Sequence, residues 1–139
     1  ILIPKLAKQV KKITALDLNE AVLKLAKNRL FDDYDNVEFI AGDVFEKNLK
    51  RYHDASLFIN TSCEHMLPMN CLPLWDRYDT YFVFQSNNMD YIEDHINCVY
   101  SLEEFKSQLP ENATVLFEDE IQDTRGTRYM LVGKVRRTI

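Results

Sequence analysis

The chain has 139 residues, 46% of them hydrophobic, and a formal net charge of −5, values that fit one soluble globular domain. No apolar run approaches the ~20 residues of a membrane span, and the negative charge argues against nonspecific binding to nucleic acid. The three cysteines form no CxxC pair, which argues against a disulfide framework and predicts a reducing, cytoplasmic setting.

The first part of the chain predicts two helices, each followed by a strand. Asn19 is placed to cap the second helix, whose apolar side chains recur at helical spacing. Asp17 ends the first apolar strand, and Gly42 with Asp43 ends the second. The four elements are expected at residues 4–12, 13–17, 20–30 and 37–41.

The second part predicts four more strands and one short helix. The helix begins at the capping box Ser101-Leu102-Glu103-Glu104 and is stopped by Pro110. The connection between the last two strands is too short for a crossover helix, so those strands should pair antiparallel. The alternation therefore predicts an α/β fold with a mostly parallel sheet and an antiparallel C-terminal hairpin. The strands are expected at residues 55–60, 80–85, 114–118 and 129–135.

Two segments carry a resemblance to a known family. Residues 13–19, Ile-Thr-Ala-Leu-Asp-Leu-Asn, and residues 37–44, Val-Glu-Phe-Ile-Ala-Gly-Asp-Val, each end a strand in an acidic residue. Their order and spacing resemble the class I S-adenosylmethionine-dependent methyltransferases. The resemblance implies a Rossmann-like three-layer sandwich, a single methyltransferase-like domain over residues 1–139, and S-adenosylmethionine as cofactor.

The family's first strand and glycine-rich loop have no counterpart in the sequence. Both should lie just before Ile1, and the chain has three glycines in all. The resemblance places the absent strand between the strands ending at Asp17 and Asn60. We therefore expect the chain to be a piece of a longer protein whose exposed strand edges favour homo-oligomer formation.

Five residues are candidates for the cofactor site. A carboxylate at the end of a parallel strand accepts hydrogen bonds from ribose hydroxyls, and the resemblance gives Asp17 that role beside Leu18. It places Asp43 and Val44 at the adenine, and Asn60 at the edge of the same site. The alternative is structural, with Asp17 capping a helix and Asp43 closing a turn.

A polar cluster follows the strand that ends at Asn60. In the family this position faces the methyl acceptor, so Asn60, Glu64 and His65 are the candidate catalytic residues. Asn60 would orient the acceptor, and Glu64 or His65 would take a proton from it. The alternative is a capped loop in which Thr61 or Ser62 begins a turn.

A second polar cluster follows the strand over residues 80–85. Gln85, Asn87 and Asn88 carry amides suited to a polar acceptor, and His95 follows closely, so these four residues are the candidate substrate-binding set. The alternative is an ordinary turn, because turns favour Asn and Ser.

The sequence predicts no metal site, because its cysteines and histidines form no closely spaced ligand pair. The potential ligands considered are Cys63, His65, Cys71, His95 and Cys98.

The predicted function is methyl transfer from S-adenosylmethionine to a small-molecule or protein acceptor. A degenerate, non-catalytic methyltransferase-like binding domain is the alternative. A nicotinamide-dependent oxidoreductase fits less well, because of the terminal hairpin.

Overall fold

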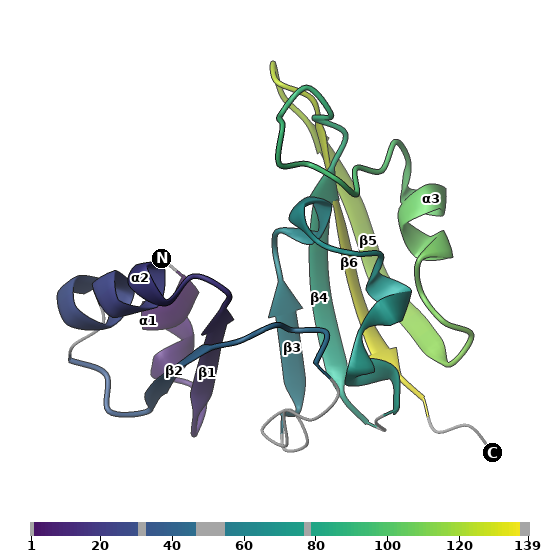
Figure 1. The fold of residues 1–139 in the computed structure, drawn as a ribbon. Helices are drawn as coiled ribbons and strands as arrows, with labels where there is room; N and C mark the ends of the chain where they lie inside the picture. The colour runs from purple at the N-terminus through teal and green to yellow at the C-terminus, as the bar shows by residue number, and fades with distance from the viewer. Residues whose placement is uncertain (1, 31–32, 47–54, 77–78, 137–139) are drawn as a thin grey trace. The chain divides into compact units, whose positions relative to one another are not determined.

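The fold was analysed in a computed structural model that describes residues 2–30, 33–46, 55–76 and 79–136. The chain divides into two compact units, Ile1–Glu46 (unit 1) and Lys47–Ile139 (unit 2), both drawn in Figure 1. Each unit is described by itself, and the single domain over the whole chain stays a prediction. No helix among the described residues is long and apolar enough to cross a bilayer.

Unit 1 contains one parallel strand pair and short helices. Strands β1 and β2 pair in a register that sets Asp17 opposite Ala41, so their carboxyl ends meet at one edge. The predicted strands are confirmed. The elements are α1 (Leu2–Ala7), β1 (Ile13–Asp17), α2 (Glu20–Leu25), a π-helical turn (Ala26–Leu30) and β2 (Val37–Ala41).

Helix α1 is shorter than the sequence pattern predicted, whereas the predicted helix over residues 20–30 is present as α2 and the π-helical turn that follows it. Helix α1 ends at Ala7 rather than at residue 12, and the Asn36 amide donates to the carbonyls of Ala7 at 2.8 Å and Val10 at 3.0 Å. This side chain takes over carbonyls that the helix end leaves unpaired. The predicted N-cap of α2 is confirmed, because Asn19 Oδ1 accepts from the N–H of Ala21 at 3.0 Å.

Unit 2 is built on a four-stranded sheet in the order β3-β4-β6-β5 (Figure 1). Strands β3 and β4 are parallel, and β6 pairs antiparallel with both β4 and β5, which confirms the predicted C-terminal hairpin. Strand β4 continues two residues past the predicted end at Gln85 and takes in Ser86 and Asn87. The strands are β3 (Leu57–Asn60), β4 (Tyr81–Asn87), β5 (Ala113–Gln122) and β6 (Thr127–Val135).

Short helices pack against this sheet. Helix α3 (Leu102–Ser107) contacts β5 and β6, and its predicted cap is confirmed, since Ser101 Oγ accepts from Glu104 N–H at 3.0 Å. The segment predicted as a loop after β3 holds single turns of 3₁₀ helix. The helix expected near residues 71–78 is a further 3₁₀ turn, and residues 77–78 lie outside the described part. These turns are Cys63–His65, Met69–Cys71 and Pro73–Asp76.

The core of unit 2 is aromatic. Phe82 and Phe84 are fully buried and stacked with centroids 4.9 Å apart, and Trp75 meets both rings edge-on. The indole N–H of Trp75 donates to the Met69 carbonyl at 2.6 Å, so its polar atom is satisfied. Gly133 of β6 lies opposite Phe82, where any side chain would overlap the phenylalanine ring.

Candidate functional site

The structure brings the four cofactor candidates of unit 1 together at the carboxyl ends of β1 and β2. The N–H of Gly42 donates to the Asp17 carbonyl at 3.0 Å, which ties the two strand ends to each other. Asp17 and Leu18 are exposed, whereas Asp43 and Val44 are half-buried. This edge therefore presents two carboxylates beside two apolar side chains.

Each of these carboxylates also has a local structural role. Asp17 Oδ1 accepts from the N–H of Asn19 at 2.8 Å, and Asp43 Oδ1 accepts from the N–H of Phe45 at 2.9 Å. Within the described residues, the second carboxylate oxygen of each makes no hydrogen bond. One oxygen thus shapes the turn while the other is available to a ligand, and the site fits a group that carries hydroxyls and an amine.

Asn60, at the end of β3, is 8% exposed and its amide is used inside its own loop. Its Oδ1 accepts from the N–H of Ser62 at 3.0 Å, and its Nδ2 lies 3.2 Å from Met66 Sδ and 3.8 Å from Met69 Sδ. The loop is held by Asn60 and not by a cap from Ser62, which occupies the N-cap position of the following turn but makes no side-chain cap hydrogen bond. The catalytic and cofactor roles of Asn60 stay predictions.

Glu64 and His65 follow on the 3₁₀ turn after β3. The Glu64 side chain points inward and the residue is only 6% exposed, although carboxylates seldom occupy such positions. Its Oε1 lies 3.9 Å from Nε2 of the more exposed His65, and its buried Oε2 has no hydrogen-bond partner. His65 Nδ1 lies 3.2 Å from the Asp94 carbonyl. Both residues have the hydrogen-bonding capacity to move a proton, and neither is saturated.

Three of the predicted acceptor-binding residues lie at the end of β4, where two of them hold the chain in place. Asn87 is 2% exposed and accepts from the N–H of Met89 at 2.8 Å. Asn88 Oδ1 accepts from the N–H of Thr127 at 2.8 Å. Gln85 is half-buried within β4. Binding of an acceptor by these amides stays a prediction.

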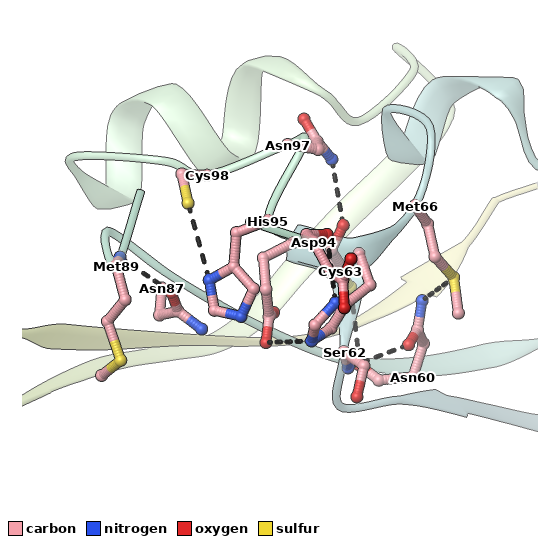
Figure 2. Close-up of polar contacts among 12 residues, drawn as sticks. Asn60, Ser62, Cys63, Met66, Asn87, Met89, Asp94, His95, Asn97 and Cys98 are labelled. Carbon is pink, nitrogen blue, oxygen red and sulfur yellow. Dashed lines mark hydrogen bonds and ion pairs between the residues drawn. The ribbon is translucent and has the colours of Figure 1, made fainter. Parts of the chain in front are cut away.

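A connection between two loops, which local sequence patterns did not indicate, fixes the position of Glu64. The N–H of Asn97 donates to the Glu64 carbonyl at 2.9 Å, and its amide donates to the Cys63 carbonyl at 3.2 Å (Figure 2). The Asn97 and Gln108 amides pair reciprocally at 2.9 and 3.1 Å, and Gln108 also accepts from Met69 N–H at 3.1 Å. Nothing in the sequence around Gln108 marks this role, because its partners are far along the chain.

This connection brings His95 to the turn that carries Glu64 and His65. The two imidazole rings meet edge-to-face with centroids 4.4 Å apart. One ligand atom from each of Glu64, His65 and His95 lies within 4.8 Å of the others. The three side chains form a cluster that we call the Glu-His-His cluster.

The cysteines near this cluster are unsuited to nucleophilic chemistry. Burial raises the pKa of the Cys63 thiol well above its usual range, and the thiol contacts the Asn60 carbonyl at 3.5 Å. Burial, followed by the charges of Asp90 and Glu64, also raises the pKa of Cys98. Both thiols are therefore protonated near neutral pH.

The comparisons with known proteins give structural neighbours only. No protein-family model and no curated protein sequence matches the chain. The N-methyltransferase NodS from Bradyrhizobium japonicum WM9 aligns with a TM-score of 0.74 and 15% identity, over 96% of this chain and 78% of NodS. An S-adenosylmethionine-dependent methyltransferase from Clostridium acetobutylicum ATCC 824 aligns with a TM-score of 0.68 and 14% identity, over 98% of this chain and 80% of its own.

A third neighbour, TrmN from Thermus thermophilus, aligns with a TM-score of 0.61 and 13% identity. The alignment covers 89% of this chain and 36% of TrmN. Structural alignments at identities this low establish the fold and do not establish the activity. The strand order, the antiparallel C-terminal hairpin and these neighbours together show that the chain has a class I methyltransferase-like fold of the Rossmann-like α/β class.

Proposed function

We propose that the chain is an S-adenosylmethionine-dependent methyltransferase whose cofactor site is the edge formed by Asp17 and Asp43. The observation that carries the proposal is the placement of these two carboxylates at the adjacent ends of paired parallel strands. Open α/β sheets bind nucleotide-like ligands at this edge. The structural neighbours named as methyltransferases support the same class of ligand.

The residues of unit 1 have distinct roles in the proposal. The unpaired oxygen of Asp17 accepts hydrogen bonds from the ribose hydroxyls, and that of Asp43 accepts from the adenine amino group. Leu18, which is 75% exposed, and Val44 provide apolar surface against the adenine ring. The cofactor, when bound, supplies a methyl group on a positively charged sulfur.

The proposed acceptor is a small molecule or a protein. Methyl transfer needs alignment of the acceptor atom and, for a protonated acceptor, a base. Asn60 and the substrate-binding candidates Gln85, Asn87, Asn88 and His95 would orient the acceptor, with Glu64 or His65 taking the proton. The setting we propose is cytoplasmic, which the three free cysteines support, and formation of a homo-oligomer is also part of the proposal.

A non-catalytic binding domain is the second candidate function. The observation that favours it is the engagement of Asn60, Asn87 and Asn88 in hydrogen bonds that hold their own loops. Such a domain would retain the Asp17 edge without transferring a methyl group. Transfer of a labelled methyl group to any acceptor in a mixture of small molecules and proteins would argue for the enzyme.

The cofactor site is tested by calorimetric titration of the purified chain with S-adenosylhomocysteine. Asp17→Asn keeps the oxygen that accepts from Asn19 but removes the charge, so we expect at least a roughly tenfold loss of affinity. Asp35→Asn is the matched control, because Asp35 is exposed and precedes β2 at the opposite edge. Equal affinity of the Asp17→Asn variant and the unmodified chain would contradict the proposed site.

A further inference from the structure

The Glu-His-His cluster combines side chains that bind transition metals. Imidazole nitrogens and a carboxylate oxygen are the usual ligands of zinc and related divalent ions. Glu64 and His65 come from one 3₁₀ turn, and His95 comes from the loop after β4. Because one ligand atom of each lies within 4.8 Å of the others, a single ion can reach all three after small side-chain rotations.

The buried Glu64 carboxylate is a second, independent observation that points to cation binding. Glu64 is 94% buried, as its exposed fraction of 6% implies, and its Oε2 has no hydrogen-bond partner. Among the described residues, no lysine or arginine forms an ion pair with it. The contact of its Oε1 with His65 Nε2, at 3.9 Å, is too long for a hydrogen bond. A buried, unpaired carboxylate is costly, and a bound cation removes that cost.

The two histidines are oriented as metal ligands usually are. His65 Nδ1 lies 3.2 Å from the Asp94 carbonyl, an acceptor that fixes the proton on Nδ1 and leaves the Nε2 lone pair available. His95 Nδ1 lies 3.9 Å from Cys98 Sγ, and the other ring nitrogen of His95, Nε2, takes no part in this contact (Figure 2). The rings pack edge-to-face, and one ligand atom of each histidine lies within 4.8 Å of one of Glu64.

We propose that Glu64, His65 and His95 form a binding site for a divalent transition-metal ion of the zinc class. Ligand atoms around a tetrahedral zinc lie about 3.4 Å apart, so the cluster contracts slightly on binding. Three protein ligands leave a coordination position for water or for an oxygen of another ligand. The site lies wholly in unit 2 and stands apart from the cofactor proposal, and when the ion is bound its ligation replaces the acceptor-side roles proposed above for Glu64, His65 and His95. It differs from the sequence prediction of no metal, which weighed the three cysteines with His65 and His95 but not Glu64.

A simple ion pair between Glu64 and protonated His65 explains less of the geometry. It leaves Glu64 Oε2 without a partner and assigns no role to His95, whose ring is held 4.4 Å from that of His65. It also predicts no response of the chain to metal ions.

The first test is calorimetric titration of the chelator-treated chain with zinc chloride and, in parallel, magnesium chloride. We expect one zinc ion per chain, with magnesium binding roughly 100-fold more weakly or not at all, because imidazole suits zinc and magnesium prefers oxygen ligands. Absence of saturable zinc binding, or tighter binding of magnesium, overturns the proposal.

Two variants locate the ion. Glu64→Gln and His95→Gln should each lower zinc affinity by roughly tenfold or more. Glu93→Gln is the matched control, because Glu93 is an exposed carboxylate in the loop that carries His95. Zinc binding by Glu64→Gln or His95→Gln with the affinity of the unmodified chain overturns the assignment.

Thermal melting of the same variants separates binding from folding. Zinc should raise the melting temperature of the unmodified chain, as any ligand of the folded state does. Without metal, Glu64→Gln should melt at or above the temperature of the unmodified chain, since it removes a buried unpaired charge. An equal rise with zinc in Glu64→Gln contradicts the site. No S-adenosyl compound is present, so this result is independent of the cofactor test.

Discussion

Units 1 and 2 place their candidate residues by different means. In unit 1, Asp17 and Asp43 stand at the ends of two paired strands, and each carboxylate contacts the backbone two residues farther along. In unit 2, Glu64 and His95 are brought together by Asn97, which bonds to a turn more than 30 residues away in sequence. The first site depends on local geometry and strand register, and the second depends on packing between distant segments.

The two units also differ in how many hydrophobic side chains they bury. Leu23 is the buried hydrophobic residue of unit 1 among those described, whereas unit 2 buries a stacked aromatic core around Phe82 and Phe84. A thin core suits exposed carboxylates that need only a strand end. A buried carboxylate such as Glu64 loses its hydration, so the packing around it must be tight enough to offset that cost.

The largest effect should come from Gly133→Ala in unit 2. The added Cβ overlaps the Phe82 ring and lies 2.5 Å from the Thr114 carbonyl, so the sheet must shift, at a cost of about 3 kcal/mol. Trp75, the single tryptophan, reports the unfolding of unit 2 by its fluorescence.

Leu116→Ala is the control for this variant, because Leu116 is 59% exposed and its loss should change stability by less than about 0.5 kcal/mol. Equal denaturation midpoints for Gly133→Ala and the unmodified chain would show that unit 2 is not tightly packed at this position.

Asn97→Ala should have the next largest effect, about 2 kcal/mol, because it removes the bond to the Cys63 carbonyl and the reciprocal pair with Gln108, whose Nε2 loses its acceptor. The measurement is denaturant unfolding followed by Trp75 fluorescence. Asn70→Ala, at an exposed position, should leave stability unchanged. A loss as small as that of Asn70→Ala would show that the loops of unit 2 are held by other contacts.

The two helix caps allow a matched comparison between the units. Asn19→Ala in unit 1 and Ser101→Ala in unit 2 should each cost about 1 kcal/mol locally. Amide hydrogen exchange at Ala21 and Glu104 should therefore become about fivefold faster. Asn19→Asp and Ser101→Thr, which keep the capping oxygen, should restore slow exchange. Unchanged exchange in the alanine variants would contradict the assigned caps.

The smallest effect concerns Tyr100, whose pKa is raised to about 12, first by the hydrogen bond that its hydroxyl donates to Asp90. Because the folded pKa is raised, this contribution to stability is full below pH 10.0 and is lost as the pH rises towards about 12. Titration of tyrosinate absorbance should show a late component that Tyr100→Phe diminishes, leaving the part from Tyr129, whose pKa burial also raises. A late component that is undiminished in Tyr100→Phe would contradict the assignment to Tyr100.

Sequence patterns predicted those features that depend on neighbouring residues. The strands over 13–17 and 37–41, the caps at Asn19 and Ser101 and the C-terminal hairpin are all confirmed. Each is specified within a few residues, by apolar alternation, a capping side chain or a short connection.

The features that were missed depend on distant partners. Helix α1 ends early where the Asn36 amide donates hydrogen bonds to the carbonyls of Ala7, the last helical residue, and of Val10 beyond it. Strand β4 extends through Ser86 and Asn87 because β6 pairs with polar residues that local propensity assigns to a turn. The sequence named Glu64, His65 and His95 as site residues but did not predict their cluster, since the contacts of Asn97 and the burial of Glu64 depend on distant partners.

The most direct test of the proposed cofactor site is a backbone amide NMR spectrum of the chain titrated with S-adenosylhomocysteine. We expect saturable shifts at the amides of Leu18, Asn19, Asp43 and Val44, which border the two carboxylates, and their loss in Asp17→Asn. A folded chain whose spectrum does not change, or whose shifts lie away from the ends of β1 and β2, would contradict the proposed site.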